Sequence, residues 1–237
     1  MEVDNRGSGE AASITGKLGF ELSVTFGKFG RCRARPIIKR AYSTRRNLDT
    51  ELRSCLLWWL SFLDGFVPRP IPTALKDMPL VISYSDGEGD WAGIGAALWH
   101  PAKSFPLAVY SEVPVHIREH WRIVSKSENF EDIFLVEALG PLLLLLTFPK
   151  LLSECLWLHF IDNSAPEASL VRGSSASPLG DHVVGLTWTC IQQRAIWAYF
   201  NPSDGLSRRK FEGPWRQVYC VPFPTDKVLE YARSFGH

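Results

Sequence analysis

The sequence of 237 residues contains only five cysteines, and no two of them form a C-x-x-C pair. Their odd number and wide separation exclude a zinc-finger spacing and argue against a disulfide framework. The N-terminus is acidic and polar, whereas a signal peptide needs a basic and then an apolar region. The longest bulky apolar runs, 55–60 and 142–146, are far shorter than the about 20 residues that span a bilayer. We therefore expect an intracellular protein, in cytoplasm or nucleus, with no membrane-spanning segment.

The chain has almost no net charge, at +1, but its charge is unevenly distributed. Residues 1–46 carry ten Lys or Arg against four acids, a balance of +6, and the remaining chain is therefore at −5. Such asymmetry often marks a basic segment that meets a polyanion, joined to a domain whose acids have another role. An ordinary solvated basic face is the more common cause of a basic run.

Composition and patterning divide the chain into segments. With 46% hydrophobic residues and nine Trp, the chain must bury a core. Apolar residues at spacings of three and four over 48–63 predict an amphipathic helix capped by Asp49 or Thr50. Four prolines within 67–79 end it. The predicted segments are a disordered N-terminus (1–16), a basic segment with this helix (17–76), a folded domain (77–212) and a C-terminal tail (213–237).

The folded domain reads as a mixed α/β sheet. Strand-like runs at 80–84, 94–99 and 107–110 are separated by turn residues, which predicts an antiparallel meander. An apolar helix over about 130–148 follows, and then a buried strand that ends at Asp162. Two helices, a strand at 195–200 and a last helix complete the pattern. Crossovers of this kind place helices against a sheet that is partly parallel.

Four acids fall at positions where an α/β sheet binds ligands. Asp86 lies at the end of the first strand, and Asp162 ends the fourth. Glu137 lies among apolar residues of the long helix, and Asp204 opens the last helix. If the first and fourth strands are neighbours, their carboxylates meet at one edge of the sheet. Clustered carboxylates repel one another unless cations compensate, and oxygen ligands suit Mg²⁺. The pattern as a whole indicates two-metal phosphodiester hydrolysis, whereas each acid taken alone reads as an ordinary exposed cap or turn carboxylate.

The segments around these acids resemble the ribonuclease H (RNase H) family. YSDGEGDWAGIGAALW (84–99) resembles its first hairpin, FLVEALGPLLLLL (134–146) its glutamate helix, HFIDNSAP (159–166) the strand with its third acid, and NPSDGLSRR (201–209) its last acidic segment. The closest version is the RNase H domain of retroelement reverse transcriptases, of the tyrosine-recombinase-bearing type. GKLGF (16–20) and GRCRARPI (30–37) resemble the connection segment that precedes it there.

The resemblance implies an α/β fold with a mixed five-stranded sheet, three antiparallel strands and then parallel ones, helices on both faces and a basic N-terminal appendage. It implies hydrolysis of the RNA strand of an RNA/DNA hybrid, with two Mg²⁺ or Mn²⁺ ions. The metal ligands would be Asp86, Glu137, Asp162 and Asp204. The polymerase part of a reverse transcriptase is the implied protein partner. Expected nucleic-acid contacts, to phosphates or 2′-hydroxyls, are Arg31, Arg33, Arg35, Asn163, Ser164, Ser174 and Ser175.

Departures from the family pattern leave two alternatives open. Phe200 runs directly into Asn201, where the family has several more residues, and no histidine lies between Cys190 and Asp204. The first alternative is therefore a catalytically degenerate remnant that still binds nucleic acid. The second is a 3′-5′ exonuclease of the same fold, which the D-x-E pattern of Asp86 and Glu88 suggests. No polymerase motif is present, which favours a C-terminal piece of a longer protein or a stand-alone remnant.

Overall fold

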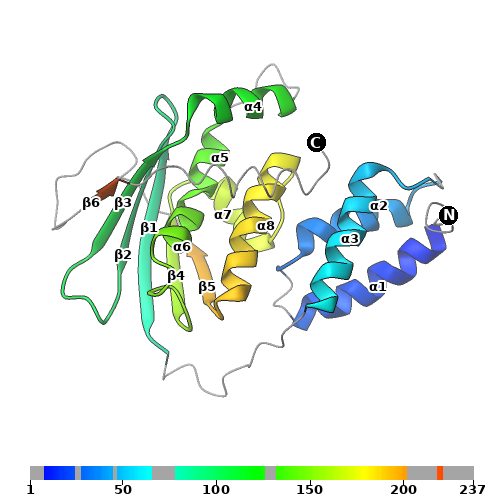
Figure 1. Ribbon diagram of the computed structural model, residues 1–237, viewed down its shortest axis with the longest axis horizontal. Coiled ribbons are helices and arrows are strands. Elements are labelled where there is room, and N and C mark those ends of the chain that lie inside the picture. Colours follow the sequence, from blue (N-terminus) through cyan, green and yellow to red (C-terminus); the bar gives the residue numbers. More distant parts are fainter. Residues whose placement is uncertain are drawn as a thin grey trace.

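The computed structural model describes residues 8–24, 28–44, 47–65, 78–125, 132–201 and 218–220. Asp204, most of the proline-rich segment, the predicted last helix and most of the C-terminal tail lie outside these residues. Three N-terminal helices stand beside a mixed sheet and the helices that cover it (Figure 1). No described helix is both long and apolar enough to cross a membrane.

The sheet has six strands in the order β5-β4-β1-β2-β3-β6. The predicted meander is confirmed, because β1 (Leu80–Glu88), β2 (Gly93–Trp99) and β3 (Leu107–Glu112) pair antiparallel in sequence order. β4 (Leu156–Ile161) runs parallel to β1, and β5 (Trp197–Asn201) runs parallel to β4. The five expected strands of the mixed sheet are confirmed, and a short sixth strand, β6 (Val218–Cys220), pairs parallel with β3.

The described helices of the α/β part cover one face of this sheet. They are α4 (Val115–Ser125), α5 (Ile133–Ala138), α6 (Gly140–Thr147), α7 (Ser164–Arg172) and α8 (Pro178–Gln193) (Figure 1). Burial alternates along β1 and β4, as expected when one face of a strand packs on a core. On the opposite face Leu80 and Tyr84 are exposed. The expectation of helices on both faces is therefore met on one face only within the described ranges.

The predicted long apolar helix is two helices. α5 ends at Ala138 and α6 begins at Gly140, with Pro141 in its first turn. Proline suits a first turn because its missing N–H would have had no helical partner there. Gly140 lies against the hydroxyl of Ser85 in β1, where a Cβ would overlap it. The junction therefore brings the helix backbone directly onto the strand.

The N-terminal region is a small helical unit. α1 (Ser8–Val24), α2 (Arg31–Ala41) and α3 (Thr50–Asp64) share a core in which Leu18, Ile37 and Trp59 are buried. α3 confirms the predicted helix, and Asp49 is its cap, since Asp49 Oδ1 accepts the N–H of Leu52 at 2.8 Å. Disorder over 1–16 is wrong for residues 8–16, because α1 packs its apolar side on α2.

Candidate functional site

The register of the two central parallel strands brings two of the predicted acids together. The last β1–β4 pair is Ser85 with Ile161. Asp86 follows Ser85 and Asp162 follows Ile161, and neighbouring strands lie about 4.8 Å apart. β1 itself continues to Glu88 by pairing with β2, so Asp86 lies inside the strand and not at its end. Asp86 is buried, at 5% exposure, whereas Asp162 is exposed.

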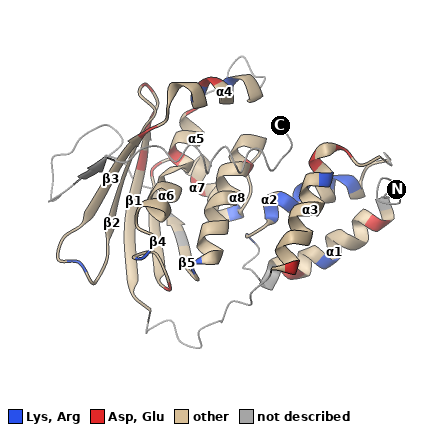
Figure 2. Cartoon of the chain, viewed as in Figure 1, with Lys and Arg blue, Asp and Glu red and all other residues tan. Residues whose placement is uncertain are grey.

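Glu137 reaches the same edge because α5 crosses β1 without a side chain between them. A Cβ on Gly87 would stand 2.5 Å from Glu137 Cγ and 2.8 Å from the Glu137 backbone nitrogen. Only glycine permits this approach. The apolar core also holds α5 in place, because Leu135, Val136 and Ala138, the neighbours of Glu137, are all buried in it. Figure 2 shows acidic segments where β1 ends beneath α5.

The charges on Asp86 and Asp162 act on Glu137. The pKa of Glu137 is raised to about 7, chiefly by burial and also by these two charges, while hydrogen bonds from the side chain and the backbone of Asn163 lower it. Glu137 is 6% exposed, and its Oε2 makes no hydrogen bond in the described part of the chain. A buried carboxylate oxygen without a donor is costly unless a proton or a cation compensates it.

The donor chemistry of this edge fits the divalent ions that the resemblance implies. Carboxylate oxygens are the preferred ligands of Mg²⁺, and Glu137 Oε2 is such an oxygen with no other described partner. Asp86, Glu137 and Asp162 would hold the ions. Among the described residues no three His, Cys, Asp or Glu side chains lie close enough to bind one ion together. Asp204, the fourth predicted ligand, lies outside the described residues.

Asn163, a predicted nucleic-acid contact, is partly exposed and uses its side chain for two hydrogen bonds within the protein. It is the N-cap of α7, where its Oδ1 accepts the N–H of Ala165 at 3.0 Å. Its Nδ2 donates to Glu137 Oε1 at 3.2 Å. The neighbouring Ser164 is exposed. Sequence reasoning missed the contact with Glu137 because the two residues are far apart in the chain.

The three arginines predicted to contact phosphates have different environments, although α2 as a whole is basic (Figure 2). Arg33 is fully buried and lies 5.6 Å from the centre of the Trp58 ring, so its assignment to a phosphate contact is corrected. Arg35 forms an ion pair with Asp181 at 2.8 Å. Arg31 is exposed, and its Nη1 donates to the Arg172 carbonyl at 3.2 Å.

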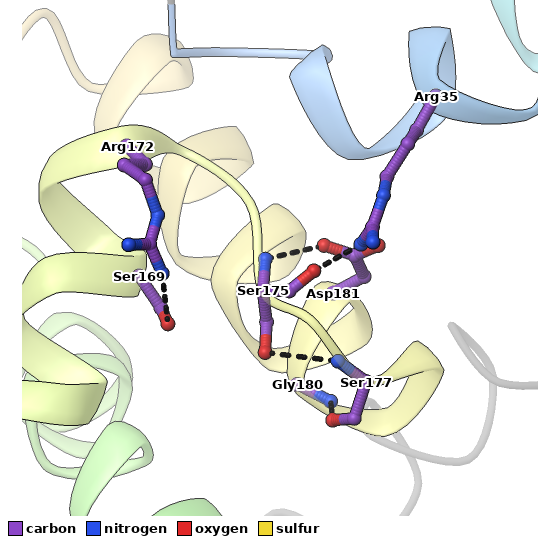
Figure 3. Close-up of polar contacts among 7 residues, drawn as sticks. All are labelled: Arg35, Ser169, Arg172, Ser175, Ser177, Gly180 and Asp181. Carbon is purple, nitrogen blue, oxygen red and sulfur yellow. Dashed lines mark hydrogen bonds and ion pairs between the residues drawn. The ribbon is translucent and has the colours of Figure 1, made fainter. Parts of the chain in front are cut away.

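Two of the predicted serines, Ser174 and Ser175, lie in the loop between α7 and α8, where α2 docks (Figure 3). Ser175 is buried, its N–H donates to Asp181 Oδ1, and its carbonyl accepts from Arg35. Ser175 therefore joins this loop to α2 and α8, and a direct contact of its side chain with nucleic acid is disfavoured. Ser174 is partly exposed and stays a candidate contact.

An open pocket of about 510 Å³ lies beside this loop, between α5 and α7. Phe134, Ala165, Ser169, Arg172 and Ser177 are among its lining residues. Its cation, Arg172, donates to Ser169 Oγ at 3.4 Å. None of the three described acids of the candidate site lines this pocket.

Arg118 is a further residue that sequence reasoning missed. It donates to the carbonyls of Gly89 and Asp90 and forms an ion pair with Asp132 at 2.6 Å. It thereby ties the β1–β2 turn, directly after Asp86, to α4 and to the start of α5. A basic residue in a helix carries no sequence signal for such a role.

No family model matches the chain, and no match is found among the curated proteins or the solved structures. Function is therefore inferred from the site and from the motifs around it.

Proposed function

We propose that this chain is a metal-dependent endonuclease that hydrolyses the RNA strand of RNA/DNA hybrids, as the RNase H part of a retroelement reverse transcriptase. The observation that carries the proposal is the meeting of Asp86, Glu137 and Asp162 at one edge of the sheet. The strand arrangement supports it as well, because three antiparallel strands followed by two parallel ones are what the resemblance implies.

The protein's own contribution is to hold anionic oxygens where divalent ions can bind. Bound Mg²⁺ or Mn²⁺ would activate water and stabilise the leaving oxygen during attack at phosphorus. Glu137 is fixed by the surrounding apolar core and by Asn163. Asp86 is held in a strand that is paired with β2. Their rigidity matters because loosely held ligands lose metal affinity and activity.

Contacts outside the carboxylates would provide hybrid binding. Arg31 and Ser164 are exposed and Ser174 is partly exposed. Arg35, whose side chain is 36% exposed, and Asn163 keep part of their surface as well, although both are engaged in contacts within the protein. Phosphate contacts would give affinity without sequence preference, and 2′-hydroxyl contacts would distinguish the RNA strand. The polymerase part of a reverse transcriptase is the proposed protein partner.

The exonuclease alternative is disfavoured by the position of Glu88. Both of its carboxylate oxygens accept backbone N–H groups, from Asp90 and Trp91, at 2.9 Å each. Glu88 therefore serves the β1–β2 turn, whereas the helical Glu137 takes the place beside Asp86.

The test is cleavage of an RNA/DNA hybrid labelled on each strand, with Mg²⁺ or Mn²⁺. We expect cuts within the RNA strand only, and at least about a 100-fold loss in Asp86→Asn because a metal ligand is removed. Glu88→Gln is the matched control, two residues along the same strand, and should retain activity. Cleavage of the DNA strand, or digestion from 3′ ends that requires Glu88, would contradict the proposal.

A non-catalytic hybrid-binding module is the second candidate. The observation that favours it is that the described acids do not by themselves form an ion-binding trio. Hybrid binding without cleavage at any divalent ion concentration would support this second function, with Asp204 the first position to investigate.

A further inference from the structure

We propose that Asn163 is a positioning residue that orients Glu137 for metal binding. The inference rests on the proposed function, because it takes Glu137 to be a metal ligand. It assigns Asn163 a role within the protein, in place of a direct contact with nucleic acid.

The geometry shows one side chain with two simultaneous tasks. Asn163 follows Asp162 and has extended backbone angles, φ −84° and ψ 122°, as N-cap residues do. Its carbonyl oxygen accepts the N–H of Ala165 at the start of α7. Because this bond fixes the amide plane, the NH₂ group at the other end is aimed at Glu137 Oε1, at 3.2 Å.

The hydrogen bond from Asn163 makes the two carboxylate oxygens of Glu137 different from each other. Oε1 has a donor, while Oε2 is buried and makes no hydrogen bond in the described ranges. The carboxylate is thus held in one rotation, with a single oxygen left for an ion. Groups that orient a ligand through a second hydrogen bond typically contribute 10–100-fold to metal affinity.

The chemistry explains why an amide occupies this position. Asn, Asp and Ser cap helices about equally well. An ionised Asp accepts only, and it would add a fourth negative charge beside Asp86, Glu137 and Asp162. Serine is neutral but is too short to cap α7 and reach Glu137 together. Only the amide accepts at one end and donates at the other without changing the charge.

The experiment measures Mn²⁺ binding to the full-length chain without substrate, by electron paramagnetic resonance, together with the melting temperature. In Asn163→Ser the cap is retained, as is the backbone N–H that also acts on Glu137, and only the side-chain amide donor is lost. We therefore expect Mn²⁺ affinity to fall by about 10-fold or more with little change in melting temperature. Asp49→Ala is the control, because it removes an acid and the cap of α3 far from the site. It should lower the melting temperature and leave Mn²⁺ affinity unchanged.

The outcomes separate this inference from the proposed function. Wild-type Mn²⁺ affinity in Asn163→Ser would overturn the role of Asn163 and leave the nuclease proposal standing. If the wild-type chain binds Mn²⁺ no better than Glu137→Gln does, the metal site itself is absent, and both proposals fail.

Discussion

Asp86 and Asp162 are the first residues beyond the last pair of two neighbouring parallel strands, β1 and β4. The two residues can move apart only if β1 and β4 lose the register that also pairs the buried residues Val81 and Trp157. Two carboxylates fixed at such a spacing repel each other, and the third at Glu137 adds to the repulsion. The sheet thus maintains an arrangement of charge that a divalent cation would stabilise.

Gly87→Ala should damage the site by displacing α5. Its Cβ would meet Glu137 Cγ at 2.5 Å and the Glu137 nitrogen at 2.8 Å, both shorter than real contacts. Overpacking of this kind costs about 1–3 kcal/mol, which we expect to appear in urea unfolding. Gly89→Ala is the matched control, because its Cβ would meet only Ile133 Cδ1, at 3.9 Å. Equal stability of the two variants would contradict the close crossing of α5 over β1.

The ionisation of Glu137 should make the metal-free protein less stable as the pH rises. Its pKa is about 7 in the folded chain against an ordinary 4.5, so folding favours the protonated form. That contribution is fully present below about pH 4.5 and is lost as the pH rises through about 7. Melting temperatures in a chelator should therefore fall across this window in the wild type and fall less in Glu137→Gln.

Divalent ions should oppose that loss, because an ion that binds the ionised carboxylates stabilises the folded state. The same melting series with saturating Mg²⁺ should remain flat, or rise, above pH 7. If the melting temperature of the wild type followed the same pH profile as that of Glu137→Gln, with or without Mg²⁺, the raised pKa of Glu137 would be contradicted.

His159 should make the protein less stable as the pH falls, which is the opposite of the effect of Glu137. It is fully buried, its Nδ1 lies 2.6 Å from Ser83 Oγ, and its Nε2 lies 2.9 Å from Ser85 Oγ. Burial lowers its pKa to about 3, so the folded state holds it neutral. Its contribution to stability is present above about pH 6.5 and is lost as the pH falls toward 3.

Urea unfolding of the wild type and of His159→Gln from pH 7 to pH 4 would test this. We expect the variant to be less stable at pH 7 by about 1–3 kcal/mol, because buried hydroxyls lose a partner. Its stability should also decline less in acid. Parallel pH profiles would show that His159 does not titrate on unfolding.

The ion pair of Arg35 and Asp181 should join the N-terminal helices to α8. Arg35 also donates to the Ser175 carbonyl, and the Asp181 side chain is 13% exposed. A double-mutant cycle with Arg35→Met and Asp181→Asn should give a coupling of about 1–2 kcal/mol, since hydrogen bonds to partly buried charges exceed those at a free surface. Additive effects would mean that α2 docks through its apolar contacts alone.

Features determined by local pattern were predictable from the sequence. The three antiparallel strands follow from turn residues that lie between strand-like runs. Asp49 is a possible helix cap because it stands directly before a segment whose apolar residues recur at spacings of three and four. Asp86 and Asp162 could be placed at one edge because strand order follows from the order of elements.

Features determined by distant contacts were not predictable. The small residues of 8–16 read as disorder, yet Ala11 is buried on the other N-terminal helices. Arg33 reads as a surface cation, and only tertiary packing buries it. The break at Gly140 and the bond from Asn163 to Glu137 depend on partners 55 and 26 residues away. A local sequence window contains no signal for the bond, whereas the Gly140-Pro141 pair is a local signal for a helix boundary that the long apolar run hides.

Anomalous diffraction from crystals of the chain grown with Mn²⁺ would show directly whether the three carboxylates hold an ion. We expect an anomalous peak at ligand distance, about 2.1 Å, from Glu137 Oε2 and from an oxygen of Asp86 or Asp162. Bound Mn²⁺ that touches none of these three carboxylates, or no bound Mn²⁺ at a saturating concentration, would contradict it.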